Sequence, residues 1–388
     1  MAISLEFYGN NGEITASREG ATRSLPGTAI CRSLAGILLL FSGTAFQLQA
    51  EEVLRPYSMP GRLVNIGTHR LHIHCTGEGT PAVIIDSGLG GVSLEWKIVQ
   101  AGMAKYVRVC SYDRAGYGWS DPGPEPRTTQ QITKELHALL INADIPPPYI
   151  LVGHSFGGYN IRYFASTYPQ NVAGLVLVDA SHPDQVNRLP QRNVNKKVTR
   201  PENSWTVRLA APVISDNYPA ESKQHAYVLM AGYKAAYTQM QEWDNFMISS
   251  QQVTALNNLP DVPLTVISRG RRVWPDTPQG DEAERVWSEL QDELCQLTGH
   301  SVHIIAAQSG HLVHLDQPDL VINSVLKTVV SANEFRIIRI AAKRQQLLLA
   351  GGLETESYDY GYDVDSLFGY PWHDSTGHFY PANLNSSY

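Results

Sequence analysis

A serine with a glycine two residues to either side is the residue best placed to do chemistry in this sequence. In Gly153-His154-Ser155-Phe156-Gly157, the G-x-S-x-G spacing is typical of a sharp turn that exposes a nucleophilic serine. Glycine is needed there because a larger side chain would clash with the tight backbone. The spacing predicts that Ser155 is a nucleophile, and the alternative is an inert serine in a glycine-rich turn.

A serine hydroxyl is protonated at neutral pH and needs a base within hydrogen-bond reach. Among 13 histidines, His311 is the best candidate because it follows the apolar run "SVHIIAA" in a Ser-Gly-His turn. The carboxyl ends of parallel strands are where functional side chains converge. His314, three residues later, is the competing base but lacks the glycine turn. With a histidine base, we expect activity to fall in acid as the imidazole becomes protonated.

The elements around Ser155 fit this role. The segment "PYILV" before it is short and apolar, and so predicts a buried strand. The segment "GYNIRYFASTYP" after it predicts a helix that Pro169 stops. A strand, a sharp turn and a helix form the context in which a nucleophile motif carries weight.

The rest of the chain alternates apolar runs with segments of helix length. The runs "RLVNIG" and "HRLHIHC" predict a hairpin, and later runs predict strands at residues 81–86, 107–113, 174–181, 262–268 and 301–307. This order predicts an α/β fold with a mostly parallel central sheet covered on both faces by helices. We assign residues 60–333 to this domain.

Two regions break the alternation. Residues 182–259 contain helical patterns without an evident strand, and predict a helical insertion that forms a lid over the site or a merely structural subdomain. Residues 334–388 begin with the basic amphipathic segment "EFRIIRIAAKRQQLLLA" and continue into a region rich in tyrosine, glycine and aspartate. We expect this C-terminal extension to be a helix followed by a poorly ordered tail.

Residues 1–50 resemble a secretory signal peptide preceded by an N-terminal extension. The segment "CRSLAGILLLFSGTAFQLQA" has a basic start, an apolar core and neutral residues before Glu51. Its apolar core is shorter than the roughly 20 residues of a comfortable transmembrane helix. The pattern predicts export, to a periplasm or out of the cell, while an uncleaved membrane anchor and a cytoplasmic protein are the alternatives.

Composition narrows the range of ligands. A formal net charge of -7 and a pI near 6.0 argue against nucleic acid and against an anionic membrane surface as partners. The four cysteines show no C-x-x-C spacing, so we expect no structural zinc site and no bound metal. We therefore expect a small-molecule substrate and predict no stable protein partner.

Five segments together resemble one known superfamily. In order along the chain they are "DSGLGG", "YDRAGYGWSDPGP", "LVGHSFGG", "LVLVDASHPDQ" and "SGHLVHLDQP". Their order and spacing are similar to those of the α/β-hydrolase fold superfamily, and to its bacterial serine hydrolases in particular, over roughly residues 62–330. The resemblance implies that Ser155 is the nucleophile, that His311 is general base and then general acid, and that no cofactor is needed.

The resemblance also implies an oxyanion hole. Its donors would be the backbone amides of Leu89 and Phe156, with Gly88 beside the substrate. This chain has Ser87-Gly88 where many relatives have His-Gly. Because the donor is a backbone amide, this departure affects the conformation of the loop and leaves the chemistry possible.

The segment "YDRAGYGWSD" contains further candidates. Asp113 and Arg114 could be taken for catalytic groups, but we interpret them as structural braces of the site wall, as in similar proteins. Trp96 and Trp119 are candidates for lining the substrate pocket, or else they belong to the core.

Two positions could supply the acid that orients His311. Asp179 ends the strand-like run "LVLVDAS", whereas Asp276 lies in the long loop "SRGRRVWPDTPQGDE", with Asp281 and Glu282 further on. A carboxylate at a strand end is held by rigid backbone, and some relatives place the acid there. We favour Asp179, whose alternative role is to cap the turn amides of residues 181 and 182.

These residues predict a serine hydrolase that cleaves a carboxylic ester or a related acyl bond through an acyl-enzyme intermediate. An acyltransferase or a cofactor-free haloperoxidase would use the same residues. Epoxide hydrolases and dehalogenases of this fold use an aspartate nucleophile, which Ser155 excludes. An alternative from another class is a non-catalytic ligand-binding protein on the same fold.

Cys75 and Cys110 lie in the predicted second and fourth strands, which are neighbours in the sheet order of this fold. A bridge between them is conceivable in an exported protein. We favour two buried thiols that behave as small hydrophobic side chains.

Overall fold

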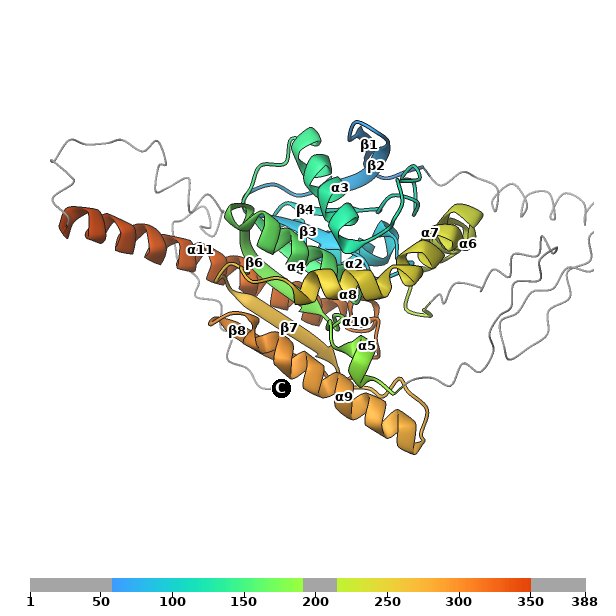
Figure 1. Cartoon of the computed structure of the whole chain (residues 1–388). Coiled ribbons are helices and arrows are strands. Elements are labelled where there is room, and N and C mark those ends of the chain that lie inside the picture. Colours follow the sequence, from blue (N-terminus) through green and yellow to red (C-terminus); the bar gives the residue numbers. More distant parts are fainter. Residues whose placement is uncertain (1–57, 191–214, 350–388) are drawn as a thin grey trace, which may run out of the picture.

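An eight-stranded sheet forms the centre of the protein, whose computed structural model describes residues 58–190 and 215–349 (Figure 1). Its strands are β1 Arg62–Asn65, β2 Arg70–Thr76, β3 Ala82–Asp86, β4 Val109–Tyr112, β5 Tyr149–His154, β6 Val172–Val178, β7 Leu264–Arg269 and β8 Ser301–Ala306. They lie in the order β1-β2-β4-β3-β5-β6-β7-β8. The predicted hairpin of β1 and β2 is confirmed; β2 also pairs with β4 in antiparallel fashion, and all later pairs are parallel.

Helices fill the connections between the strands. They are α2 Lys97–Met103, α3 Thr129–Asn142, α4 Gly157–Thr167, α5 Gln185–Arg188, α6 Ala220–Ala231, α7 Tyr233–Asp244, α8 Phe246–Thr254, α9 Pro278–Leu294, α10 Val313–Asp316 and α11 Pro318–Leu349. Short 3-10 helices occur at η1 Ser93–Trp96, η2 Pro169–Asn171 and η3 Cys295–Leu297. This arrangement confirms the predicted α/β-hydrolase fold.

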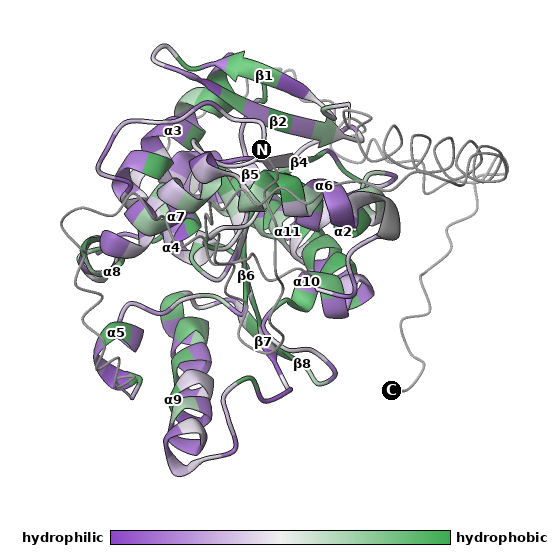
Figure 2. Cartoon of the chain, turned by 90° about the vertical axis from the view of Figure 1, so that its right-hand side faces the viewer, coloured by the Kyte–Doolittle hydropathy of each residue, from purple (hydrophilic) through white to green (hydrophobic). Residues whose placement is uncertain are grey.

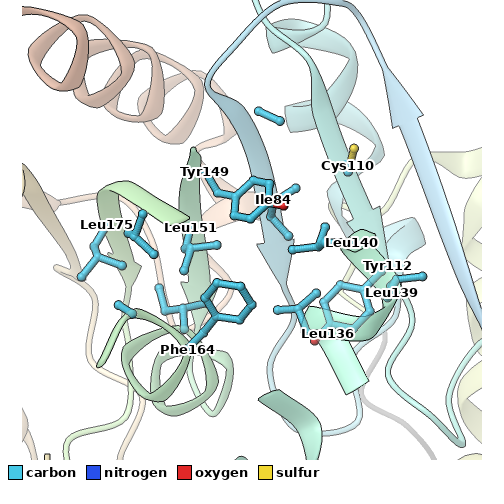
Figure 3. Close-up of a cluster of buried hydrophobic side chains, with 14 of the residues drawn as sticks. Ile84, Cys110, Tyr112, Leu136, Leu139, Leu140, Tyr149, Leu151, Phe164 and Leu175 are labelled. Atoms are coloured by element: carbon cyan, nitrogen blue, oxygen red, sulfur yellow. The ribbon is translucent and has the colours of Figure 1, made fainter. Parts of the chain in front are cut away.

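Both faces of the sheet are apolar because side chains alternate along each strand. On one face, Ile84 and Leu151 pack with residues of α3 and α4, such as Leu136 and Phe164 (Figure 3). On the other face, neighbouring strand residues pack with α2 and α11. Figure 2 shows hydrophobic residues along β6 and many hydrophilic ones along the peripheral α9. Two cores therefore hold the strand ends rigidly.

The predicted insertion at residues 182–259 contains α5, α6, α7 and α8 in its described part. Helix α8 packs on α4 and α3, next to the turn that carries Ser155. Within residues 182–190 and 215–259 we find helices and no strand, as the sequence suggested. A role of these helices as a lid stays a prediction.

A disulfide joins Cys75 to Cys110. The two residues are direct partners in the antiparallel register of β2 and β4, with Cα atoms 4.0 Å apart. Our preference for two free thiols is therefore wrong, because cross-strand register brings the side chains face to face. The bridge ties the antiparallel hairpin to the strand that leads into Asp113 and Arg114.

Helix α11 continues without a break across the predicted domain boundary at residue 333 and projects beyond the sheet in Figure 1. Among residues 58–190 and 215–349, no helix has both the length and the apolar character to cross a membrane. The predicted signal peptide at residues 1–50 and the predicted tail after residue 349 lie outside the described residues. The domain boundaries and the export of the protein stay predictions.

Candidate active site

Ser155 lies on a sharp turn between β5 and α4, as the motif predicts. Its backbone φ is 50°, in the left-handed region that non-glycine residues rarely adopt. A Cβ on Gly157 would collide with the carbonyl oxygen of Asp86, and one on Gly153 would lie 2.6 Å from that of Gly157. The turn is fixed by neighbouring strands, because the Ser155 amide donates to the Val178 carbonyl at 3.2 Å. The two glycines therefore permit a conformation that presents the serine side chain to the pocket.

His311 and Asp179 are brought together from 132 residues apart. His311 Nδ1 lies 2.6 Å from Asp179 Oδ2, so the carboxylate fixes the ring and leaves Nε2 as the other nitrogen. Asp179 directly follows β6, and His311 lies in the loop between β8 and α10. This contact is the geometry expected of a base and its orienting acid.

The surroundings of Asp179 keep it ionised. Its side chain is fully buried and also accepts hydrogen bonds from Trp287 Nε1 at 2.8 Å and from Arg269 NH1 at 3.0 Å. Burial alone would raise the pKa of Asp179, but the hydrogen bond and charge of His311, with the Arg269 charge, lower it to about 2. The Asp179 carboxylate is therefore negatively charged at any pH well above about 2.

Asp276, the alternative acid, has a side chain that is 98% exposed and lies 3.8 Å from Arg272. The alternative capping role of Asp179 is also not seen. The amide of Ser181 donates to the Ser155 carbonyl, and that of His182 donates to Gln185. The geometry therefore favours Asp179 over Asp276 as the partner of His311.

His314, the competing base, is fully buried and does not line the pocket. It stacks on Trp96 with ring centroids 4.2 Å apart, and burial holds its pKa well below the usual range. His154 contacts the backbone of His311, because its Nε2 lies 2.8 Å from the carbonyl oxygen of that residue. Burial, with the nearby His311, lowers the pKa of His154 to about 3. Both residues therefore act as neutral packing groups behind His311.

The predicted oxyanion donors lie at the pocket. Leu89 and Phe156 both line it, and among the described residues neither backbone amide donates to a protein acceptor. Gly88 lies close to Ser155, since a Cβ built on Gly88 would lie 3.3 Å from the Cβ of Ser155. Two unpaired amides beside a serine are suited to bind a developing negative oxygen.

Arg114 fixes the loop that carries Leu89. Its guanidinium donates to the carbonyl oxygens of Ser87 at 2.5 Å and Gly88 at 2.8 Å. It also pairs with Asp86 Oδ1 at 2.9 Å and with both carboxylate oxygens of Glu242 on α7. The interpretation of Arg114 as a structural brace agrees with these contacts, although its partners are Asp86 and Glu242 rather than Asp113.

A cavity of about 310 Å³ joins these groups. Most of the side chains that line it are apolar or aromatic. The complete lining is Leu89, Ser155, Phe156, Ser181, Gln185, Leu189, Trp243, Phe246, Arg269, Val273, Trp274, Trp287 and His311. A larger hollow, of about 660 Å³, lies near the opposite end of β6, around Pro169 and Phe335, and contains neither the serine nor a histidine.

Trp96 and Trp119, the two tryptophans expected at the pocket, do not line it. Trp96 is fully buried and donates from Nε1 to Ser87 Oγ at 3.0 Å, whereas Trp119 packs against His72. The aromatic wall instead comes from the insertion and from the β7–α9 region, which the sequence analysis did not identify. No local pattern in the sequence separates these aromatic residues from core residues.

One cluster of described side chains has the residue types of a metal site. Ligand atoms of His182, Asp184 and Glu293 lie within 4.8 Å of one another. Arg188 NH1, however, lies 2.5 Å from Glu293 Oε1, and the charge of buried Arg162 acts on His182. With guanidinium groups already beside these ligands, we assign no metal to them.

We compared the chain with protein families, with curated proteins and with solved structures. The sequence profile of the alpha/beta hydrolase family matches residues 82–324. Probable transporter efuK of Hormonema carpetanum is 27% identical over 330 residues, which cover 75% of this chain but only 44% of that protein. Uncharacterized protein YqjL of Bacillus subtilis is 28% identical over 251 residues, covering 64% of this chain and 83% of that protein.

A solved structure described as a probable hydrolytic enzyme of Pseudomonas aeruginosa PAO1 has the same fold. Its TM-score is 0.55 at 17% sequence identity, and the alignment covers 70% of this chain and 95% of that chain. The family profile covers more than half of the present chain, and the sheet order agrees with it. The protein therefore belongs to the alpha/beta hydrolase family.

Proposed function

We propose that the protein is a serine hydrolase that cleaves a carboxylic ester, or a related acyl bond, through an acyl-enzyme intermediate. The observation that carries this proposal is the contact of His311 Nδ1 with buried, ionised Asp179, at a pocket that also contains Ser155 and two unpaired backbone amides. Family membership supports hydrolysis in general; the choice of serine chemistry rests on this geometry.

In the first half of the reaction, Ser155 Oγ attacks the carbonyl carbon and its proton passes to His311 Nε2. Asp179 stabilises the imidazolium that forms, and the amides of Leu89 and Phe156 bind the oxyanion. When the tetrahedral intermediate collapses, the bond to the leaving oxygen breaks and His311 returns its proton to that oxygen. An alcohol leaves, and the acyl group remains on Ser155.

In the second half, His311 removes a proton from water, whose oxygen attacks the acyl carbon. Collapse of the second tetrahedral intermediate returns the proton to Ser155 and releases the carboxylic acid. If another alcohol takes the place of water, the same steps transfer the acyl group, so an acyltransferase uses the same residues. A ratio of ester to acid products in a water and alcohol mixture distinguishes the two.

The pocket favours a substrate with uncharged apolar groups. Its walls include Phe246, Trp243, Trp274 and Trp287. Arg269, the one arginine or lysine in the lining, is already paired with two carboxylates, so it offers little to an anionic substrate. We therefore propose a small neutral ester, consistent with a cavity of about 310 Å³.

Labelling with a fluorophosphonate probe and turnover of p-nitrophenyl esters of graded chain length test the proposal. Ser155→Ala should lose labelling and lose several powers of ten in turnover, with a small residue from the oxyanion hole. Ser166→Ala, on the helix α4 that follows the Ser155 turn but outside the pocket lining, is the matched control and should keep both. Full turnover in folded Ser155→Ala would exclude Ser155 as the nucleophile and end this proposal, whereas neither labelling nor turnover in the unchanged protein would favour a binding protein.

A further inference from the structure

Arg269 shares an oxygen atom with the candidate base. It ends β7, and its NH1 lies 3.0 Å from Asp179 Oδ2, the same oxygen that contacts His311 Nδ1 at 2.6 Å. The Arg269 backbone amide also donates to Asp179 Oδ1 at 3.2 Å. A permanent positive charge and a titratable ring therefore use the same carboxylate.

The arginine is built into its position. Its side chain is 3% exposed, and its guanidinium carbon lies 4.5 Å from the ring centroid of Trp274 and 4.8 Å from that of Trp287. Its NH2 donates to Glu284 Oε2 at 3.1 Å, and the other Glu284 oxygen accepts from the amides of Val273 and Trp274. Two tryptophans and a second carboxylate thus hold the guanidinium against Asp179.

This arrangement changes what Asp179 can do for His311. A carboxylate stabilises an adjacent imidazolium through its negative charge. Arg269 offsets part of that charge, and burial makes the effect larger than at an exposed pair. His154 from β5 and His314 from α10 also face His311, and burial lowers the pKa of both, so they are neutral. The carboxylate of Asp316 on α10 accepts from the amide of Gly310, the residue before His311, at 2.9 Å. Arg269 is then the main cation near the pair.

We propose that Arg269 is a positioning residue that sets the proton affinity of the Asp179–His311 pair. Its hydrogen bonds fix the carboxylate, and its charge offsets part of the negative charge that Asp179 presents to His311. The inference rests on the proposed function for its catalytic consequence, while the electrostatic effect does not depend on turnover. Arg269 is the last residue of β7, so the end of β7 contributes to the site even though the candidate acid, Asp179, follows β6.

The test compares pH profiles of kcat/KM for Arg269→Gln and Arg269→Lys with the unchanged protein. Removing the positive charge favours protonated His311, so Arg269→Gln should move the acid limb upward by about one pH unit, the usual size of a neighbouring charge effect. Arg269→Lys keeps the charge and should leave the limb near its original position, while lowering kcat because a lysine cannot reproduce the fork of bonds. Exposed Arg271→Gln is the matched control and should shift nothing.

Glu284→Gln tests the sign independently. It removes the second anion beside Arg269, whose charge then acts more fully on Asp179, so the acid limb should move downward. A purely structural role predicts no opposite shifts. If Arg269→Gln fails to fold, Glu284→Gln still decides the matter, because an unmoved or raised limb contradicts the proposal.

NMR titration of His311 in the full chain, assigned with His311→Gln, separates this inference from the proposed function. Opposite shifts of the His311 titration in the two variants support the role of Arg269 even if the protein fails to label with a fluorophosphonate, in which case only the proposed function fails. An identical His311 titration in unchanged, Arg269→Gln and Glu284→Gln proteins overturns the inference even if ester turnover is confirmed.

Discussion

Two buried arginines support different parts of the candidate site. Arg114 lies beside the loop that carries Leu89, and Arg269 lies beside Asp179. Arg114 pairs with Asp86 and Glu242, and it also donates to two backbone carbonyls of the loop that carries Leu89. Arg269 pairs with Asp179 and Glu284, and its Nε has no partner among the described residues. One arginine is bound to backbone and to carboxylates outside the chemistry. The other is bound to the acid that orients the base.

Arg114 is therefore expected to affect mainly the shape of the site, and Arg269 mainly its electrostatics. Because Arg114 acts on carbonyl groups, its removal should alter the position of the oxyanion donors and the attachment of α7. Because Arg269 acts on Asp179, its removal should alter the proton affinity of His311 within an otherwise similar site. Similar residues with similar burial can therefore support a site in ways that different measurements detect.

The largest expected effect is on the Arg269 side, at Asp179 itself. Asp179→Asn keeps the size of the side chain but no longer selects the His311 tautomer, so turnover at saturating ester should fall by up to about 10⁴-fold with the fold intact. Asp276→Asn, at the exposed alternative acid, is the matched control and should be near normal. A large loss of turnover in Asp276→Asn, with near-normal turnover in Asp179→Asn, would contradict our assignment of the acid.

Arg114→Gln should have the next largest effect, and mainly on stability. It leaves Asp86 and Glu242, both fully buried, without their cation, and loss of one partner from a buried ion pair typically costs about 3–5 kcal/mol. Urea unfolding should show a larger loss for Arg114→Gln than for Arg269→Gln, because the Glu284 side chain is 24% exposed and can be hydrated. Equal losses in the two variants would remove the distinction between the two arginines.

The smallest effect concerns Glu95, a buried carboxyl near the Arg114 side. Burial raises the pKa of Glu95 to about 7, although the nearby Tyr218 hydroxyl and the Arg114 charge act to lower it. A raised pKa means that its stabilising contribution is present below the ordinary value of 4.5 and is lost as pH rises through about 7. Glu95→Gln avoids that loss, so it should be more stable than the unchanged protein at pH 8, by up to about 3 kcal/mol, and similar at pH 4.5.

Unfolding curves at several pH values, with exposed Glu78→Gln as the control, measure this effect. A stability difference between Glu95→Gln and the unchanged protein that does not vary with pH would show that the carboxyl does not titrate in this range.

The sequence predicted those parts of the site that local patterns specify. Ser155 was evident because its turn needs glycine at fixed positions, and Asp179 because a carboxylate directly follows an apolar strand. Trp96 could not be assigned, since a tryptophan has the same local pattern whether it packs in the core or lines a pocket. The pairing of Arg114 with Glu242, 128 residues away, depends on how α7 packs and has no local signal.

The same limits apply to the fold. Alternation of apolar runs and helices was sufficient for a parallel sheet with helices on both faces. We predicted two free thiols at Cys75 and Cys110 instead of a disulfide, because whether they bond depends on exact cross-strand register, which the sequence pattern does not give. The aromatic walls were missed because they are assembled from α7, α8 and the β7–α9 region, which are distant in sequence from Ser155.

The backbone at Ser155 and Asp179 has a consequence for how this chain can change over evolutionary time. Their φ values of 50° and 40° lie where glycine is favoured and ordinary side chains are strained, typically by about 1–3 kcal/mol. A mutation of Ser155 to glycine would relieve that strain and gain stability while removing a reactive group, whereas glycine at Asp179 would leave buried Arg269 without its carboxylate. Mutational drift that conserves only the fold would therefore favour replacement of Ser155. The left-handed turn at Ser155 is therefore a cost in folding free energy that selection for folding alone would not maintain.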